Sequence, residues 1–303
     1  MSARIERFGD DLCLIGLTPP IPGFTNFIGV WLRTGAPSFL LDVGPAATSG
    51  DLLEALRELG AERLDFILLT HIHMDHAGAA GHVAARFPGA PVVVHESGIE
   101  HLVDPTRLWA GTLKTLGDTG RAYGQIQPVP AGQILDANHL SSEFVRPVYT
   151  PGHAPHHVSY RTPTCLFAGE ACGVHFRLPS GKEYMRPATP PKFFLETAVG
   201  SIDTLLDEEP ARMCVGHLGL EEDGARLLRA HREQLLRWEA MLSPLVDDSA
   251  DETVVSRCLE TVLRDDPLLA NLAGLDEREQ ERERFFLKNS VRGFMGHLRG
   301  GRA

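Results

Sequence analysis

The sequence predicts an α/β protein, and three observations carry that prediction. Short apolar runs of strand type alternate with segments of helical periodicity through the first half of the chain. Several of these runs end at glycine or at polar residues that typically lead into turns. From about residue 223 the periodicity becomes helical. A chain of 303 residues has room for one large domain, or for a large domain plus a small one.

The individual elements follow from the spacing of apolar residues. The segment 51–60 has leucines at helical spacing and ends in glycine, and 76–89 is typical of a helix that stops at Pro-Gly. The apolar runs are too short for buried helices and are bounded by turn residues. We therefore expect strands at 38–44, 64–70, 91–96, 144–150, 156–162 and 164–170.

Two later segments differ from this pattern. Residues 175–200 are rich in proline and have little periodicity, which indicates an irregular and functional loop. The sequence SPLVDDSADE at 243–252 is typical of a hinge and is followed by amphipathic helices. We therefore predict a catalytic domain at 1–245 and a helical C-terminal extension at 246–303, which either covers the site or forms a homodimer surface.

The composition and charge of the chain disfavour two classes of partner, nucleic acids and membranes. The net charge is −11, which disfavours a nucleic-acid partner because phosphate contacts need clustered Lys and Arg. No apolar run approaches the ~20 residues that span a bilayer, so we expect no membrane partner. The charged N-terminus has no signal-like apolar core, and the five scattered cysteines form no CxxC pair. We therefore expect a cytoplasmic protein without a disulfide framework.

The segment THIHMDHAG at 70–78 concentrates groups that bind metal ions. Imidazole and carboxylate are good ligands for Zn²⁺, Fe²⁺ and Mn²⁺. Four such ligands so close in sequence do not readily surround a single ion, which favours two neighbouring ions completed by distant residues. Candidates for completion each follow a strand-like run and lie beside glycine, namely His153 in TPGH, Glu170 in FAGE and His217 in CVGHLG.

These motifs resemble those of the metallo-β-lactamase-fold superfamily, in their order along the chain. The resemblance covers roughly residues 10–240 and implies a four-layer αββα sandwich with the site at one edge. It implies that His71, His73 and His153 hold one metal ion and that Asp75, His76 and His217 hold a second, with Glu170 bridging. The segment LLDVG at 40–44 resembles an early family strand whose aspartate, Asp42 here, supports the site.

The chain also departs from the family pattern. Glu170 stands where an aspartate is usual, and its extra methylene lengthens the reach by ~1.5 Å. Three alternatives stay open for Glu170. It bridges both ions, it binds one ion only, or its presence leaves a site for a single ion. His156 stands where glycine is common, and we expect it in a turn, whereas we expect His157 to support the site or the fold.

The resemblance to the glyoxalase II and lactonase-like branch implies a metal-dependent hydrolase. A metal-bound hydroxide would attack an ester, thioester or lactone of a small molecule, and Asp75 would orient it and carry its proton. The cofactors would be two divalent ions, with zinc favoured and iron or manganese as alternatives. A mono-iron persulfide dioxygenase-like oxidoreductase and a non-catalytic metal-binding protein remain open as other functions.

Residues 175–192 carry several cations against a single acid, Glu183, in an otherwise acidic chain. Because this segment leaves the strand that ends at Glu170, one end of it lies near the site. We therefore expect Arg177, Lys182 and Arg186 to bind an anionic group of the substrate. The alternative is a solvated surface loop whose positive charges only offset the negative charge of the rest of the chain.

Overall fold

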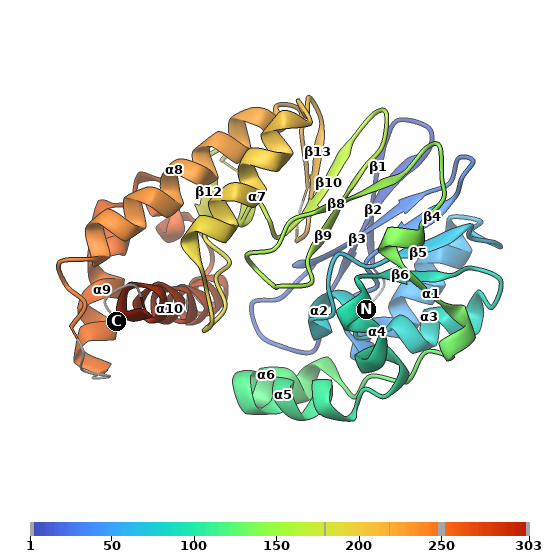
Figure 1. Ribbon diagram of the computed structural model, residues 1–303, viewed down its shortest axis with the longest axis horizontal. Helices are drawn as coiled ribbons and strands as arrows, with labels where there is room; N and C mark the ends of the chain where they lie inside the picture. Colours follow the sequence, from blue (N-terminus) through green and yellow to red (C-terminus); the bar gives the residue numbers. More distant parts are fainter. Residues whose placement is uncertain (1–2, 179, 218, 248–251, 301–303) are drawn as a thin grey trace. The chain divides into compact units, whose positions relative to one another are not determined.

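The computed structural model describes residues 3–178, 180–217, 219–247 and 252–300 (Figure 1). The chain forms two compact units. Unit 1 comprises the residues through 148 together with 158–163 and 216–219. Unit 2 comprises 149–157, 164–215 and the residues from 220 onward. The predicted domain boundary at 245/246 stays a prediction, and residues 248–251 of the predicted hinge lie outside the described residues.

A seven-stranded sheet forms the centre of unit 1 (Figure 1). Its strands follow one another in chain order, with antiparallel pairs from β1 to β4 and parallel pairs from β4 to β7. Their bounds are β1 Arg4–Phe8, β2 Leu12–Leu17, β3 Ile28–Arg33, β4 Phe39–Leu41, β5 Phe66–Leu68, β6 Val92–Val94 and β7 Ile134–Asp136. The residues of β2 and β4 are buried throughout, which explains why their apolar runs are unbroken.

The helices of unit 1 connect and follow these strands. Their bounds are α1 Ser49–Glu58, α2 Met74–Ala77, α3 Ala80–Arg86, α4 Glu96–Val103, α5 Thr106–Leu116 and α6 Asp118–Tyr123. The single helix predicted at 76–89 is therefore two short helices, which separate at Gly78 and Ala79. Strand β9 (Val158–Arg161) also belongs to unit 1, and β8 (Arg146–Tyr149) ends where unit 1 passes into unit 2.

Unit 2 has a small β part and a larger helical part. Strand β10 pairs in parallel with β13, which pairs antiparallel with β14. The bounds are β10 Leu166–Gly169, β11 Val174–Arg177, β12 Glu183–Arg186, β13 Met213–Val215 and β14 Leu220–Glu221. The helices are α7 Leu195–Asp207, α8 Gly224–Leu242, α9 Glu252–Asp265 and α10 Glu277–Gly300.

The prediction that 175–200 is irregular is wrong over about half of its length. Strands β11 and β12 form an antiparallel hairpin, and α7 begins at Leu195. Phe176, Tyr184 and Met185 are buried, so the hairpin is stabilised by its own apolar side chains. Pro187, Pro190 and Pro191 follow β12, in a segment without helix or strand that leads from the hairpin to α7.

The amphipathic helices of the C-terminal part bury their apolar faces within unit 2. Helix α8 packs against α7, and α8 and α9 each pack against α10 (Figure 1). Trp238 of α8 and Phe294 of α10 are fully buried with ring centroids 5.4 Å apart. The indole N–H of Trp238 donates to the Asp266 carboxylate at 2.7 Å, which satisfies the one polar atom of this buried ring.

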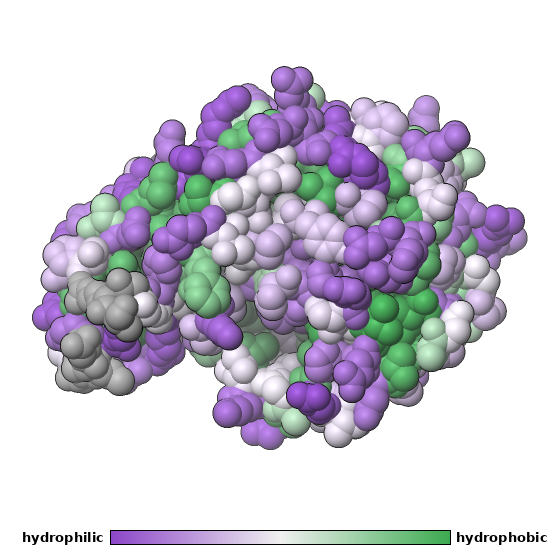
Figure 2. Space-filling view, in the orientation of Figure 1, coloured by the Kyte–Doolittle hydropathy of each residue, from purple (hydrophilic) through white to green (hydrophobic). Residues whose placement is uncertain are grey.

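Hydrophilic side chains cover much of the face shown in Figure 2, in keeping with the charged composition. Within the described ranges, no helix is both long and apolar enough to cross a membrane.

Candidate metal site

The first predicted motif follows directly after strand β5, in a backbone held by β9. The Val158 N–H donates to the Thr70 carbonyl at 2.8 Å, and the Tyr160 hydroxyl donates to the Leu69 carbonyl at 3.0 Å. These bonds fix the chain immediately before His71. Because both supports come from a regular strand, His71 starts from a defined backbone position.

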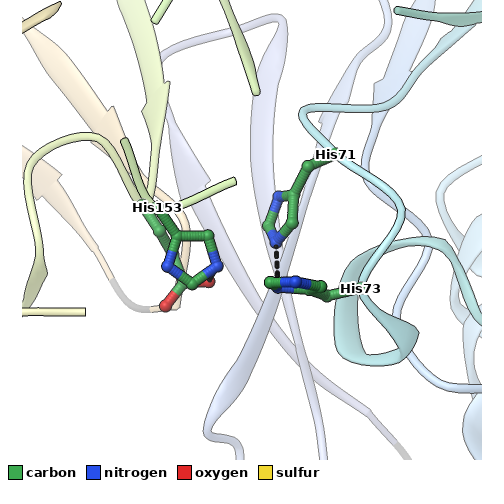
Figure 3. Close-up of side chains that lie close together, drawn as sticks. His71, His73 and His153 are labelled. Atoms are coloured by element: carbon green, nitrogen blue, oxygen red, sulfur yellow. Dashed lines mark hydrogen bonds and ion pairs between the residues drawn. The ribbon is translucent and has the colours of Figure 1, made fainter. Parts of the chain in front are cut away.

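His71 and His73 are brought together as the sequence predicts. The distance from His71 Nε2 to His73 Nδ1 is 3.0 Å, and the two rings meet edge to face (Figure 3). Two nitrogens that bind one tetrahedral zinc ion lie about 3.3 Å apart, given Zn–N bonds of about 2.0–2.1 Å. The spacing of these two imidazoles therefore suits a shared cation.

Asp75, His76 and His217 form a second group within unit 1. Each offers one ligand atom, and these atoms lie within 4.8 Å of one another. Asp75 and His76 lie on the short helix α2, whereas His217 is 141 positions after His76 along the chain (217 minus 76). The structure therefore unites the three residues to which the sequence assigns one ion.

The backbone of His217 is set by its close packing on strand β3. The Phe27 ring stacks on the His217 imidazole, with centroids 4.6 Å apart and planes 20° from parallel. A Cβ atom at Gly29 would lie 2.5 Å from the His217 carbonyl oxygen, a distance that no side chain tolerates. Gly29 is thus required at this position because it lets the two backbones approach.

Asp42 holds the first motif in place, which confirms its predicted supporting role. Its carboxylate accepts bonds from the Thr70 N–H at 2.8 Å and from the Thr70 hydroxyl at 2.9 Å. The same carboxylate lies 2.8 Å from His76 Nδ1. A carboxylate can only accept here, so Nδ1 carries the proton and Nε2 has a lone pair that can bind a metal ion.

The backbone of Asp42 is in the left-handed region, with φ of 58°. This conformation is uncommon outside glycine and costs of order 1–3 kcal/mol, although Asp and Asn adopt it more readily than other residues. The residue is also 1% exposed. The three bonds of its carboxylate are what stabilise a strained, buried charge at this point.

Unit 2 contributes the other two predicted ligands, His153 and Glu170. His153 Nε2 lies 2.9 Å from Glu170 Oε2. His153 Nδ1 lies 2.7 Å from the Ala188 carbonyl oxygen, which can only accept, so Nδ1 carries the proton. The lone pair of the imidazole is therefore at Nε2, on the side of Glu170.

Glu170 is positioned by His157, which was predicted to support either the site or the fold. The Glu170 N–H donates to His157 Nε2 at 3.2 Å, and His157 Nδ1 lies 2.8 Å from the Thr150 hydroxyl. A register shift between β10 and β13 at Phe167 and Gly169 precedes Glu170, and such irregularities commonly redirect a side chain. His156 lies in a turn, as expected.

A cavity of about 20 Å³ lies within unit 2 and is lined in part by His153, Glu170, Ala188 and Ser201. A volume of this size holds about one water molecule. It is too small for an acyl substrate, so it does not define where a substrate of this protein binds.

Carboxylates of the protein contact Arg177 and Arg186, so the expected role of these residues in binding a substrate anion stays a prediction. Arg177 Nη2 lies 2.9 Å from Glu221 and 3.0 Å from Glu183. Arg186 is buried, and its Nε lies 2.6 Å from Glu283. Burial alone would lower the pKa of Arg186, yet the Glu283 carboxylate raises it above its ordinary value. Lys182, in contrast, is exposed.

The donors described above suit a divalent cation. His76 and His153 carry their protons on Nδ1, held there by Asp42 and by a backbone carbonyl, and Asp75 and Glu170 add carboxylates. Nitrogen and carboxylate ligands of this kind fit zinc, and also iron or manganese. The sequence alone did not reveal the roles of Gly29 and Ala188, because nothing in either local pattern indicates what it touches.

The site and the fold together define a metal-binding protein of the metallohydrolase class. The sequence profile described as "Metallo-beta-lactamase superfamily" matches residues 21–217, more than half of the chain. The chain therefore belongs to the metallo-β-lactamase superfamily, and the predicted sandwich fold of that type with a helical C-terminal region is confirmed.

Individual similar proteins share between 23% and 34% sequence identity with this chain. A hydroxyacylglutathione hydrolase of Acidiphilium cryptum is 34% identical over 193 residues, which is 62% of this chain and 63% of that enzyme. A metallo-β-lactamase superfamily protein from Sulfolobus tokodaii has a TM-score of 0.64 at 24% identity, with 86% of this chain and 98% of that one covered. A metallo-β-lactamase family protein from Thermus thermophilus has a TM-score of 0.63 at 23% identity and covers 97% of this chain and 94% of its own. The two solved structures support the fold alone.

Proposed function

We propose that this protein is a metal-dependent hydrolase that cleaves an ester, thioester or lactone of a small molecule. The observation that carries the proposal is the group of Asp75, His76 and His217, with His76 oriented by the buried carboxylate of Asp42. The similarity to a hydroxyacylglutathione hydrolase favours a thioester within this class. A cytoplasmic location remains a prediction from the sequence.

The ligand sets of the proposal are those that the family resemblance implies. His71, His73 and His153 would hold one divalent ion, Asp75, His76 and His217 would hold a second, and Glu170 would bind at least one of them. Zinc is favoured, with iron or manganese as alternatives. Divalent ions in such a site acidify a coordinated water and polarise an acyl oxygen.

The residues of the chain supply orientation and proton transfer. Asp75 is half-buried on α2, where its carboxylate can hold the attacking water and accept its proton. Asp42 keeps His76 in one tautomer throughout this step, and the Phe27 ring excludes water from one face of His217. No serine or cysteine nucleophile is needed in this scheme, and Cys172 is fully buried with its pKa raised to about 12 by burial.

The proposal is tested by turnover of a substrate panel after metal analysis. The panel holds a hydroxyacyl-glutathione thioester, a lactone, an aryl ester and a phosphodiester, together with oxygen uptake on glutathione persulfide. We expect turnover of at least one acyl substrate, and a loss of about 100-fold or more in kcat for Asp75→Asn. The exposed His139 provides a control, and His139→Ala should leave kcat unchanged.

Each other outcome has a definite meaning. Oxygen uptake without acyl turnover would replace the hydrolase by the persulfide dioxygenase-like alternative. Bound metal with no turnover of any substrate would favour a non-catalytic metal-binding protein.

A further inference from the structure

The C-terminal helix α10 lies against the segment that follows the β11–β12 hairpin, and two hydrogen bonds join them. The Ser290 hydroxyl donates to the Pro187 carbonyl at 2.9 Å. In the other direction, the Thr189 hydroxyl donates to the Ser290 carbonyl at 3.0 Å. All three residues are in unit 2, and both Ser290 and Thr189 are buried. The segment is thus held on both sides of Ala188.

A buried ion pair anchors the start of the same segment. Glu283 of α10 accepts from Arg186 Nε at 2.6 Å and from Arg282 Nε at 2.8 Å. Glu283 is 0% exposed and Arg186 is 3% exposed. Breaking a buried pair of this kind is strongly destabilising, so the start of the segment follows the position of α10.

The segment approaches α10 so closely that a side chain is excluded. A Cβ atom at Gly293 would lie 2.4 Å from the Pro190 carbonyl oxygen and 3.1 Å from the Thr189 hydroxyl. Gly293 lies inside a long helix, where glycine is less favourable than alanine by about 1 kcal/mol. Close approach to the segment accounts for glycine at this unfavourable position.

Ala188, at the centre of this segment, is the residue whose carbonyl accepts from His153 Nδ1 at 2.7 Å. The position of that carbonyl decides which nitrogen of His153 carries the proton and how the ring is turned. The contacts that Glu283, Ser290 and Gly293 of α10 make with the segment thus fix one backbone oxygen, which orients the His153 imidazole. That imidazole presents Nε2 to Glu170 at 2.9 Å.

We propose that α10 is a positioning element for the metal site, with Ser290 and Gly293 as the positioning residues that place the Ala188 carbonyl on His153. This inference rests on the proposed function in one respect, which is the role of His153 as a metal ligand. Helix α10 would then tune metal affinity without supplying a ligand. Losing such a support typically lowers metal affinity about 10–100-fold.

The test compares Gly293→Ala and Ser290→Ala with a matched control. Gly293→Ala pushes the segment away from α10, whereas Ser290→Ala removes one hydrogen bond and leaves the packing intact. Gly200→Ala provides the control, because Gly200 lies inside α7 of the same unit and a Cβ there meets nothing within 4 Å. Two readouts are used, namely Zn²⁺ affinity by chelator competition and the ¹⁵N shifts of the His153 imidazole in metal-free protein.

We expect Gly293→Ala and Ser290→Ala to weaken the affinity of one Zn²⁺ about 10-fold and to shift the His153 ¹⁵N signals away from the Nδ1–H tautomer. Gly200→Ala should change neither. Unchanged affinity and unchanged ¹⁵N shifts in both folded variants would overturn the proposal. If wild-type protein binds no metal, the proposed function fails, while the ¹⁵N shifts still decide whether α10 positions His153.

Discussion

Two histidines from different units, His76 and His153, are oriented in the same way by different partners. His76 Nδ1 lies 2.8 Å from the Asp42 carboxylate, and His153 Nδ1 lies 2.7 Å from the Ala188 carbonyl. The first partner is charged and lies directly after a central strand, 34 positions before its histidine. The second partner is neutral and lies 35 positions after its histidine, in a segment that is held by α10.

One support therefore follows a strand of the central sheet of unit 1, whereas the other depends on a helical region of unit 2. The carboxylate also binds Thr70, so Asp42 fixes two parts of the first motif at once. The carbonyl of Ala188 has no charge to contribute, and its effect depends on where the segment is held. We therefore expect changes at the first support to have larger effects than changes at the second.

The largest effect is expected for Asp42→Asn. Asparagine tolerates the left-handed backbone, so the change removes mainly the charge and its bond to His76. We expect metal affinity to fall about 100-fold and the metal-free protein to lose about 2 kcal/mol of stability. Asp118→Asn is the control, because Asp118 has a side chain that is 99% exposed. Equal metal affinity in the two variants would remove the assigned role of Asp42.

A smaller effect is expected for Gly29→Ala, which acts on His217 through the backbone. The new Cβ would lie 2.5 Å from the His217 carbonyl and must displace it. We expect a loss of about 10-fold in metal affinity, within the range for a perturbed support. Gly50→Ala on α1 is the control, because a Cβ there meets nothing within 4 Å. A variant of Gly29 with wild-type affinity would show that the His217 backbone has room to adjust.

The sequence could predict the first support but not the second. Asp42 stands in an apolar run that ends in glycine, so its position at a strand end could be inferred, and the ligand motifs lie in a recognisable order. The Ala188 carbonyl is a backbone atom, and every residue has one. Its use depends on long-range contacts with Ser290 and Gly293 that no local pattern encodes.

The same limit explains the errors in the fold. Helical periodicity identified α1 and α8, but it did not reveal that Gly78 separates two short helices. The sequence also did not show that Arg177 and Arg186 pair with Glu221 and Glu283, because these partners are distant along the chain. Charge along a chain does not show which charges are paired in space.

We expect Glu283→Gln to have a still smaller effect on metal affinity, about threefold, and to change how the free energy of unfolding depends on pH. Burial alone would raise the pKa of Glu283, but Arg186 and Arg282 lower it below its ordinary value of 4.5. The ionised carboxylate therefore adds stability above that pH, and the stability is lost as pH falls through the lowered pKa. Near neutral pH, we expect the free energy of unfolding of the variant to be about 3 kcal/mol below that of the wild type, measured by urea unfolding. This difference should become smaller in acid. A deficit that does not vary with pH would contradict the ion pair.

The smallest effect is expected for Lys182→Ala. Lys182 is exposed, and the neighbouring Arg177 is already paired with carboxylates, so the hairpin presents little free positive charge. We expect KM for an anionic thioester to rise less than about twofold, in parallel with a neutral analogue. A rise of about tenfold for the anionic substrate alone would restore the hairpin as a recognition element.

If His76 and His153 each serve a metal ion, the number of ions bound per chain shows it. Protein purified without added metal would be titrated with Zn²⁺, dialysed, and measured by elemental mass spectrometry. We expect two ions per chain in the wild type, and one each in His217→Ala and His153→Ala. Wild-type protein without bound metal, or an unchanged count in both variants, would contradict it.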